Sequence, residues 1–255
     1  MSNVLTDSGL VFRREMMLVL RDPFSVIFSI VQPLVFLGLF GPLLGGSVPS
    51  EALGGHSALQ WFLPGVLVMI CLFGTSTVGA NLLYEFMTGS YERIVATPLR
   101  RSSLLIGRAL KELAPLVVQA MLIAAVALPF GFSLHPVHAL VGLLILGVFG
   151  VGIGALSYSL GIATRKREWM FWGVQQSLIF PLLILSGMML PIDSGPDWMQ
   201  VAAHFNPLSF VVNAERSLFT NATFDAAVLN GVVVAVLTCA VGLIVGVRQI
   251  RRSTT

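Results

Sequence analysis

The side chains that could support catalysis or metal binding are few and widely separated in this chain. His135 and His138 are three positions apart, a spacing that can ligate a metal, but no carboxylate or cysteine lies near them in the sequence. Ser157 would need a neighbouring base to act as a nucleophile, and no motif places one beside it. We therefore predict no catalytic residue and no metal site, and we keep an intramembrane enzyme as an alternative of a different class.

Nucleotide chemistry is missing from the sequence as well. The phosphate-binding loop G-x-x-x-x-G-K-[ST] needs a glycine directly before its lysine. Lys111 and Lys166 are the two lysines, and neither follows a glycine. The sequence therefore predicts a chain that has no ATPase motif and holds no cofactor of its own.

Long stretches without charge dominate the chain and determine its class. Hydrophobic residues make up 56% of the sequence and charged residues 11%, whereas a soluble domain carries roughly 25% charged residues. A helix of about 20 apolar residues crosses a bilayer, and an open sheet edge cannot be satisfied in lipid. The sequence thus predicts an all-α integral membrane protein, a single domain over residues 1–255 with six transmembrane helices. The predicted spans lie near residues 24–44, 61–83, 111–131, 138–163, 169–190 and 226–247.

The positions of the lysines and arginines predict the orientation. Fourteen of the 15 fall in the N-terminal segment, the loops after the second and fourth spans, and the C-terminus; Arg216 is the exception. Because cytoplasmic loops carry the excess of lysine and arginine, both ends of the chain are predicted to face the cytoplasm. The net charge of +3 is thus a topology signal, and we predict no nucleic-acid partner.

Residues 8–22 have the pattern of an amphipathic helix. At about 100° per residue, Arg14 and Arg21 fall on one side and Phe12 and Met16 on the other, and Pro23 ends the segment. We predict that this helix lies in the inner membrane interface. A cytoplasmic helix packed on protein is the alternative.

The loop between the second and third spans predicts a short separate helix. Gly89 can end the preceding helix, and Pro98 disfavours helix at Thr97. A short helix held between two spans can transmit force to a cytoplasmic partner. An ordinary basic loop is the alternative.

The segment before the last span is too apolar for a solvated loop. Asn206 followed by Pro207 is a helix start, and Pro196-Asp197 resembles a second one, with Ser194 or Gly195 as its cap. We predict two short helices that dip partly into the outer leaflet, one of them anchored at the interface by Trp198.

Small residues recur along the fourth span at spacings of three and four. This seam allows close helix packing, which we predict within the subunit, with a dimer interface as the alternative. Its members are Gly147, Gly150, Gly154, Ser157 and Gly161.

Three blocks of residues, in order along the whole chain, resemble the ABC-2 type membrane permeases, and most of all their small drug-resistance exporters. The first block is the N-terminal helix ending in Arg21-Asp22-Pro23. The second is Glu92-Arg93-x-x-x-Thr97-Pro98-x-Arg100 with Leu104-Leu105-x-Gly107-Arg108. The third is Leu185-Ser186-Gly187-x-x-x-Pro191, Pro196-x-Trp198, Asn206-Pro207-Leu208 and Arg216. The chain departs from the pattern at Phe210, where similar proteins often carry an aromatic hydroxyl, which argues against a polar role there.

The resemblance implies roles for three groups of residues. Residues 89–98 would be the coupling helix that docks on an ATPase, the coupling residues being Tyr91, Glu92, Arg93, Thr97, Pro98, Arg100 and Arg101. Residues 194–219 would form the outer re-entrant helices, with Pro191, Trp198, Asn206, Pro207 and Arg216 in that outer segment. A substrate path would use the second and fifth spans at a dimer interface, with Phe73, Thr77, Asn81, Trp172, Gln175, Gln176 and Phe180 along it. Hydrogen bonding between helices is the alternative role for the polar members of this path.

The implied function is the permease half of an ATP-driven exporter in a bacterial plasma membrane. Its implied substrate is an amphipathic or hydrophobic small molecule, drug- or antibiotic-like. Export of a lipid or a lipid-linked glycan by the same architecture is the alternative. The implied partners are the lipid bilayer, a cytoplasmic ABC ATPase that binds ATP and Mg²⁺, and a second permease subunit in a homodimer or heterodimer.

Overall fold

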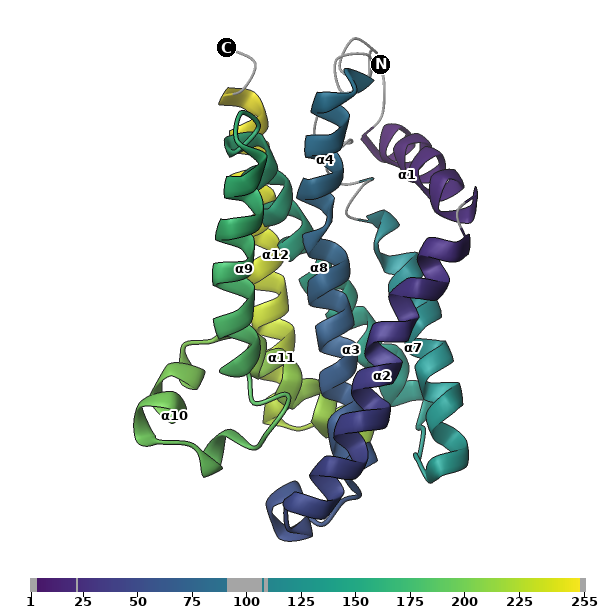
Figure 1. The fold of residues 1–255 in the computed structure, drawn as a ribbon, viewed down its shortest axis with the longest axis vertical. Helices are drawn as coiled ribbons and strands as arrows, with labels where there is room; N and C mark the ends of the chain where they lie inside the picture. Colours follow the sequence, from purple (N-terminus) through teal and green to yellow (C-terminus); the bar gives the residue numbers. More distant parts are fainter. Residues whose placement is uncertain (1–3, 22, 91–106, 108–109, 253–255) are drawn as a thin grey trace.

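The computed structural model describes residues 4–21, 23–90, 107 and 110–252, and within these ranges the chain is all-α (Figure 1). The ten α-helices with assigned bounds in these ranges are α1 (Val4–Arg21), α2 (Pro23–Ser47), α3 (Ala58–Ser76), α4 (Val78–Met87), α7 (Leu113–Ala127), α8 (Pro136–Ala163), α9 (Glu168–Ile184), α10 (Asp197–His204), α11 (Pro207–Arg216) and α12 (Ala226–Arg252). Short helical turns connect them: η1 (Ser50–Leu53), η2 (Leu128–Phe130), η3 (Ile192–Ser194) and η4 (Ser217–Asn221), the last a π-helix. This is the all-α membrane fold that the sequence predicts.

Five helical stretches of the described chain are long and apolar enough to cross a membrane. They are Ile30–Ser47, Ala58–Met87, Leu113–Phe130, Pro136–Ala163 and Ala226–Ile250. The predicted fifth span, 169–190, contains α9, whose 17 residues extend about 25 Å at 1.5 Å per residue. The helix ends at Ile184, and Gly187 adopts a left-handed φ of 71° that turns the chain. The count of six crossings therefore stays a prediction.

Helix α8 occupies the centre of the bundle. It packs against α3, α4 and α12, while α2 and α7 pack against α3 (Figure 1). Phe62, Leu63, Val66 and Leu67 of α3 are at most 1% exposed, so this helix is buried on all sides from Trp61 to Leu72. A helix that is apolar all round belongs in such a position.

The glycine seam of α8 packs within the subunit, as predicted. A Cβ added at Gly150 would lie 2.9 Å from Cγ2 of Thr75, and one at Gly161 would lie 2.8 Å from the carbonyl oxygen of Gly79. Gly152 lies outside the predicted seam and meets α12, where an added Cβ would lie 2.7 Å from the carbonyl oxygen of Thr238. At Gly152 and Gly161 the backbones of neighbouring helices approach closely, which requires glycine, whereas Gly150 makes room for the side chains of Thr75 and Cys71.

Helix α1 and the C-terminal end of α12 lie at the same end of the bundle (Figure 1). This arrangement is the one that the predicted orientation requires. Helix α1 starts at Val4, four residues before the predicted start, and buries Val11 against Gly107, where an added Cβ would lie 2.7 Å from Cβ of Val11. Leu10, by contrast, is 55% exposed. The helix thus packs on protein along one side and keeps apolar surface along another.

Candidate functional site

The second predicted span is broken at Thr77, between α3 and α4. Three consecutive hydroxyl side chains bond back to carbonyl oxygens of the preceding turn: Thr75 to Cys71 at 2.7 Å, Ser76 to Phe73 at 2.8 Å and Thr77 to Gly74 at 2.7 Å. Such bonds compete with the helix ladder and favour a bend. The break lies inside the 30-residue apolar stretch Ala58–Met87, nearer to its C-terminal end.

Ser157 of α8 bridges this break. Its hydroxyl donates to the carbonyl oxygen of Ser76 and accepts from the backbone N–H of Gly79 at 3.0 Å. Gly79 is enclosed further by Phe171 of α9, whose ring would lie 2.6 Å from an added Cβ. The backbone groups released at the break are therefore paired inside the bundle, and Ser157 has a structural partner in place of a catalytic base.

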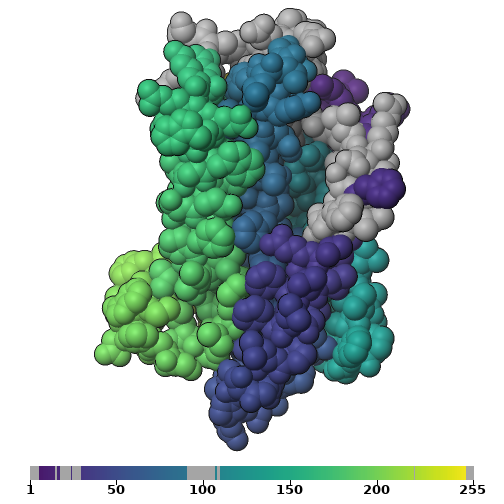
Figure 2. All heavy atoms as spheres, viewed as in Figure 1, coloured from purple at the N-terminus to yellow at the C-terminus, as the bar shows by residue number. Residues whose placement is uncertain are grey.

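The predicted path residues lie on helices that are neighbours. Helices α3, α4 and α9 lie side by side on one face of the molecule (Figure 2). Thr77, Asn81 and Gln176 are exposed on this single chain, and Trp172 and Phe180 are 42% and 51% exposed.

The two other predicted path residues are covered. Phe73 is half-buried, and Gln175 is buried, with an Oε1 that has no hydrogen-bond partner among the described residues. Gln175 therefore points into the packed side of α9, away from the exposed stripe of Trp172, Gln176 and Phe180.

The segment before the last span folds as two short helices, α10 and α11, as predicted. Asn206 caps α11 by accepting from the N–H of Leu208 at 3.0 Å, and its amide donates to the carbonyl oxygen of Leu182 at 2.7 Å. Ser209 donates to the carbonyl oxygen of Leu185 at 3.1 Å. These two side chains pair carbonyls that the end of α9 leaves without helical partners.

The cap proposed for the first short helix was wrong. Helix α10 starts at Asp197 as predicted, but its N-cap residue is Pro196 and makes no side-chain capping bond. Ser194 instead belongs to η3 and Gly195 follows it in extended conformation. Trp198 is 65% exposed, which agrees with an anchor at an interface.

Arg216 ties three segments together at the end of the bundle opposite α1. Its guanidinium donates to the carbonyl oxygens of Trp61, Gly187 and Met188 at 3.3, 2.8 and 3.1 Å, and it lies 3.5 Å from the centroid of the Trp61 ring. The side chain thereby joins α11 to the start of α3 and to the turn after α9. Several hydrogen bonds and a cation–π contact compensate for its partial burial.

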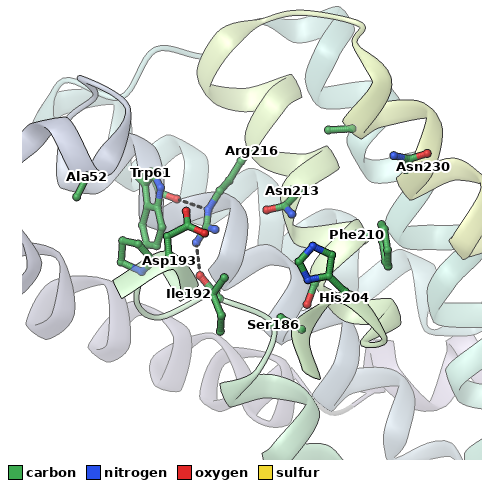
Figure 3. Close-up of a pocket in the computed structure, with 15 residues that line it drawn as sticks. Ala52, Trp61, Ser186, Ile192, Asp193, His204, Phe210, Asn213, Arg216 and Asn230 are labelled. Atoms are coloured by element: carbon green, nitrogen blue, oxygen red, sulfur yellow. Dashed lines mark hydrogen bonds between the residues drawn. The ribbon is translucent and has the colours of Figure 1, made fainter. Parts of the chain in front are cut away.

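A pocket of about 440 Å³ opens beside Arg216 (Figure 3). The polar side chains of Asp193, His204, Asn213 and Asn230 line it together with Trp61. Pro191 and Phe210 also line the pocket, whereas Trp198 does not. The predicted outer residues therefore have three different places. Arg216, Asn206 and Pro207 build the helix junction. Pro191 lines the pocket, and Trp198 lies outside it.

Sequence reasoning missed Gln60 and Glu215 at this end of the bundle. Gln60 bonds the carbonyl oxygens of Ser133 and Phe219 at 3.1 and 2.5 Å and accepts from the N–H of Ser133 at 2.9 Å, which joins α3 to two distant segments. Glu215 is fully buried. The signal for Glu215 was available, because it falls at helical spacing on the stripe of Leu208, Val211 and Leu218.

Asp225 is the charged residue at the start of α12. One carboxylate oxygen accepts from the hydroxyl of Ser217 at 2.7 Å, and the other accepts from the N–H groups of Ala227 and Val228 at 3.0 and 3.2 Å. These bonds, the one from Ser217 first, lower the pKa of Asp225 because they favour its charged form. The residue is an N-cap for the last span.

The histidines that could have held a metal pack as aromatic rings. The rings of His135 and His138 are 6.0 Å apart, edge to face, and His138 stacks on Phe224 with centroids 4.7 Å apart. No group of three His, Cys, Asp or Glu residues that could hold a metal occurs among the residues the structure describes.

All seven predicted coupling residues lie outside the described part of the chain. Tyr91, Glu92, Arg93, Thr97, Pro98, Arg100 and Arg101 are all in this group. The segment that leads to them is described: α4 ends at Met87, and Gly89 adopts a φ of 64°, the left-handed conformation expected of a residue that ends a helix.

The fold and the site define a class: an all-α, multi-pass membrane protein whose sequence carries no nucleotide-binding loop. The chain belongs to the ABC-2 type transporter family, whose model matches residues 7–220. That range runs from α1 to η4 and includes both the broken span and the α11 junction. Permeases of this family are transmembrane subunits that lack ATPase motifs of their own and work with a separate ATPase subunit.

Three relatives illustrate the similarity. The daunorubicin resistance ABC transporter permease protein DrrB1 of Streptomyces coeruleorubidus is 28% identical over 207 residues, which cover 80% of this chain and 72% of the relative. The probable doxorubicin resistance ABC transporter permease protein DrrC of Mycobacterium tuberculosis is 24% identical over 234 residues, 90% of this chain and 83% of the relative. Nodulation protein J of Azorhizobium caulinodans is 30% identical over 225 residues, 84% and 82% of the two chains.

Proposed function

We propose that this chain is the permease subunit of an exporter that moves an amphipathic or hydrophobic small molecule, drug- or antibiotic-like, out of a bacterial cell. The names of two relatives, which refer to daunorubicin and doxorubicin resistance, support this substrate class. The plasma membrane of a bacterium is the proposed location.

The observation that carries the proposal is the uncovered polar and aromatic surface on α3–α4 and α9. Thr77, Asn81 and Gln176 are exposed in stretches that are otherwise apolar, and Trp172 and Phe180 are exposed nearby in the sequence. Polar side chains in a membrane face other protein or a water-filled cavity rather than lipid. A second permease subunit placed over this face would enclose a path of mixed character, which suits an amphipathic substrate.

Energy is proposed to come from a cytoplasmic ABC ATPase that binds ATP and Mg²⁺ and docks on residues 89–98. Helix α4 leads directly from the break at Thr77 toward this segment. A push on the segment would therefore reach the break through one rigid helix.

The path is tested by efflux from cells that express the chain with its ATPase. Trp172→Ala should reduce efflux of a fluorescent amphipathic dye several-fold, because the residue lies on the exposed stripe of α9. Leu178→Ala is the matched control: Leu178 is 58% exposed on another side of the same helix. Equal efflux by both variants and the wild type would contradict the path.

The substrate class is tested separately by mass spectrometry of molecules that copurify with the complex. A lipid or lipid-linked glycan in place of a small amphipathic molecule would favour the alternative export function. It would leave the role as a permease intact.

The coupling residues are tested by charge reversal. Glu92→Arg should abolish copurification with the ATPase or leave it bound while efflux is lost, because a reversed charge meets like charge on the docking surface. Glu168→Arg, the same change in another predicted cytoplasmic segment, is the control. Normal assembly and efflux by Glu92→Arg would remove this residue from the coupling site.

A further inference from the structure

Glu215 is a carboxylic acid placed in the apolar core of the bundle. It is 0% exposed, and Leu208, Val211 and Leu218, on the same stripe of α11 and η4, are 0–1% exposed. Helix α11 packs against α3, α8 and α12, so the side chain is enclosed by helices that form predicted spans. The rest of that stripe is hydrophobic, and the acid is the one departure from it.

The carboxyl group has no hydrogen-bond partner in the described part of the chain. Neither Oε1 nor Oε2 is bonded to any described residue, and both atoms are shielded from solvent. The group lies directly against Gly142 of α8, because a Cβ added there would overlap Oε2 and would lie 2.9 Å from the ring of Phe219. Glycine at position 142 therefore leaves the space that the carboxyl group fills.

Among the described residues of the elements packed around Glu215, no cationic side chain is available as its counter-ion. On α11 itself, Arg216 is the next residue, but its guanidinium is bonded to the carbonyls of Trp61, Gly187 and Met188. The titratable residue of α3 is Cys71, whose thiol donates to the carbonyl oxygen of Leu146 at 3.2 Å.

The remaining neighbouring elements add no counter-charge. Helix α8 carries His138, stacked on Phe224, and Tyr158; α10 carries Asp197 and His204; and η4 carries no charged residue. Asp225, the cap of α12, is an anion bonded to Ser217, Ala227 and Val228, and α12 itself carries the thiol of Cys239 and then arginines from Arg248 onward, near its far end.

An ionised carboxylate in such surroundings is strongly disfavoured. Burial of a charge without a partner costs so much that the group takes up a proton and becomes neutral instead. A neutral carboxyl group, although it lacks hydrogen bonds here, avoids most of that cost. The packing around Glu215 therefore favours the neutral, protonated form of its carboxyl group.

We propose that Glu215 is a proton-binding site: its carboxyl group carries a proton while α11 is packed against α8, and the ligand of the site is H⁺. The proton is released when the two helices separate and water or a cation reaches the group. The proposal concerns this chain alone and holds whatever the substrate is.

A protonated Glu215 predicts a specific dependence of folding stability on pH. A carboxyl that stays protonated in the folded chain binds more protons than the unfolded chain does above the ordinary glutamate pKa of about 4.3. As the pH rises above this value, the folding equilibrium constant should therefore fall by up to about tenfold per pH unit.

Infrared spectroscopy of the whole chain in lipid tests the protonation state directly. The wild type at about pH 7 should show the C=O stretching band of a buried, protonated carboxylic acid, slow to exchange in heavy water. Glu215→Gln should lack this band, and Glu51→Gln, at an exposed glutamate in η1, should keep it. Absence of the band from the wild type would overturn the proposal, and this measurement does not depend on how well any variant folds.

Thermal unfolding between about pH 5 and about pH 9 tests the linkage. The melting temperature of the wild type should fall as the pH rises, and that of Glu215→Gln should change less over the same range. Parallel curves for the two proteins would overturn the proposal. So would a Glu215→Gln variant that is destabilised equally at every pH, since that pattern belongs to a carboxylate held ionised by a partner.

Discussion

Helices α8 and α9 are both apolar, yet they pack in different ways. Gly152 and Gly161 set α8 directly against backbone atoms of α12 and α4, whereas a Cβ added at Gly173 of α9 would meet nothing within 4 Å. Trp169 and Leu178 of α9 are 71% and 58% exposed. The difference in packing does not follow from hydropathy. It follows from where the glycines of each helix lie relative to neighbouring helices. We infer that α8 is the fixed scaffold and that α9 packs along a single face, which carries Phe171, Gln175, Ile179 and Leu183.

The largest effect should come from Gly152→Ala. The added Cβ would lie 2.7 Å from backbone atoms of Thr238 and Cys239, which cannot rotate away as a flexible side chain can. The two helices must separate, at a cost of about 3 kcal/mol or more. Thermal unfolding in lipid measures the loss.

Gly173→Ala is the matched control on α9. Because the site is open and helical, alanine should be neutral or stabilise the chain by about 0.5–1 kcal/mol. If both changes lower the melting temperature alike, the distinction between scaffold and peripheral helix is wrong.

A smaller effect should follow Arg216→Gln, which tests how α9 is attached. The shorter neutral side chain loses the bonds to the carbonyls of Trp61, Gly187 and Met188, and we expect a loss of about 2–3 kcal/mol. Proteolysis should become faster in residues 185–196, which follow α9. Asn213→Ala, on an exposed position of the same helix, should leave both readouts close to the wild type.

Much of this organisation was predictable from residue types and spacing. Asn206-Pro207 marked the start of α11, and the small residues of the fourth span marked its packing inside the subunit. These signals are local or periodic, so the chain need not be folded to see them. The role of Gly152, which faces α12, was not visible in this way, because its neighbours Thr238 and Cys239 are far from it in the sequence.

Other features depend on contacts between distant segments and could not be predicted. The break at Thr77 lies within a long uncharged run that is predicted as one span, and its backbone groups are paired by Ser157 from another helix. No sequence pattern marks Gln60, because only the fold brings its partners Ser133 and Phe219 close to it. The early end of α9 at Ile184 likewise reflects a turn at Gly187 that α11 supports.

Asp225→Asn should have a modest effect that depends on pH. The lowered pKa of Asp225 means that its charged form stabilises the fold above the ordinary aspartate pKa of about 3.9, and this contribution is lost as the pH falls through the lowered value. The variant should therefore melt lower than the wild type near neutral pH, and the two curves should converge in acid. A constant difference at all pH values would show that the charge of this cap does not matter.

The smallest effect on stability should come from Gln176→Leu. The side chain is exposed on α9, so the free energy of unfolding should stay within about 0.5 kcal/mol of the wild type. Efflux in cells that carry the ATPase should nevertheless fall, because a polar position of the proposed path is lost. A large drop in stability would show that α9 is part of the scaffold after all.

Because Ser157 bridges the break at Thr77, α4 can pivot as a rigid helix about that point. Helix α4 has 10 residues and is about 15 Å long. Ser157 bonds the carbonyl oxygen of Ser76 on the α3 side of the break and the N–H of Gly79 on the α4 side, so a sideways force at the outer end of α4 becomes a torque on α3 rather than a loss of helix. A helix without the break would bend along its length and spread the same force over many residues. The hydroxyl of Ser157 therefore sets the axis about which the second span can swing.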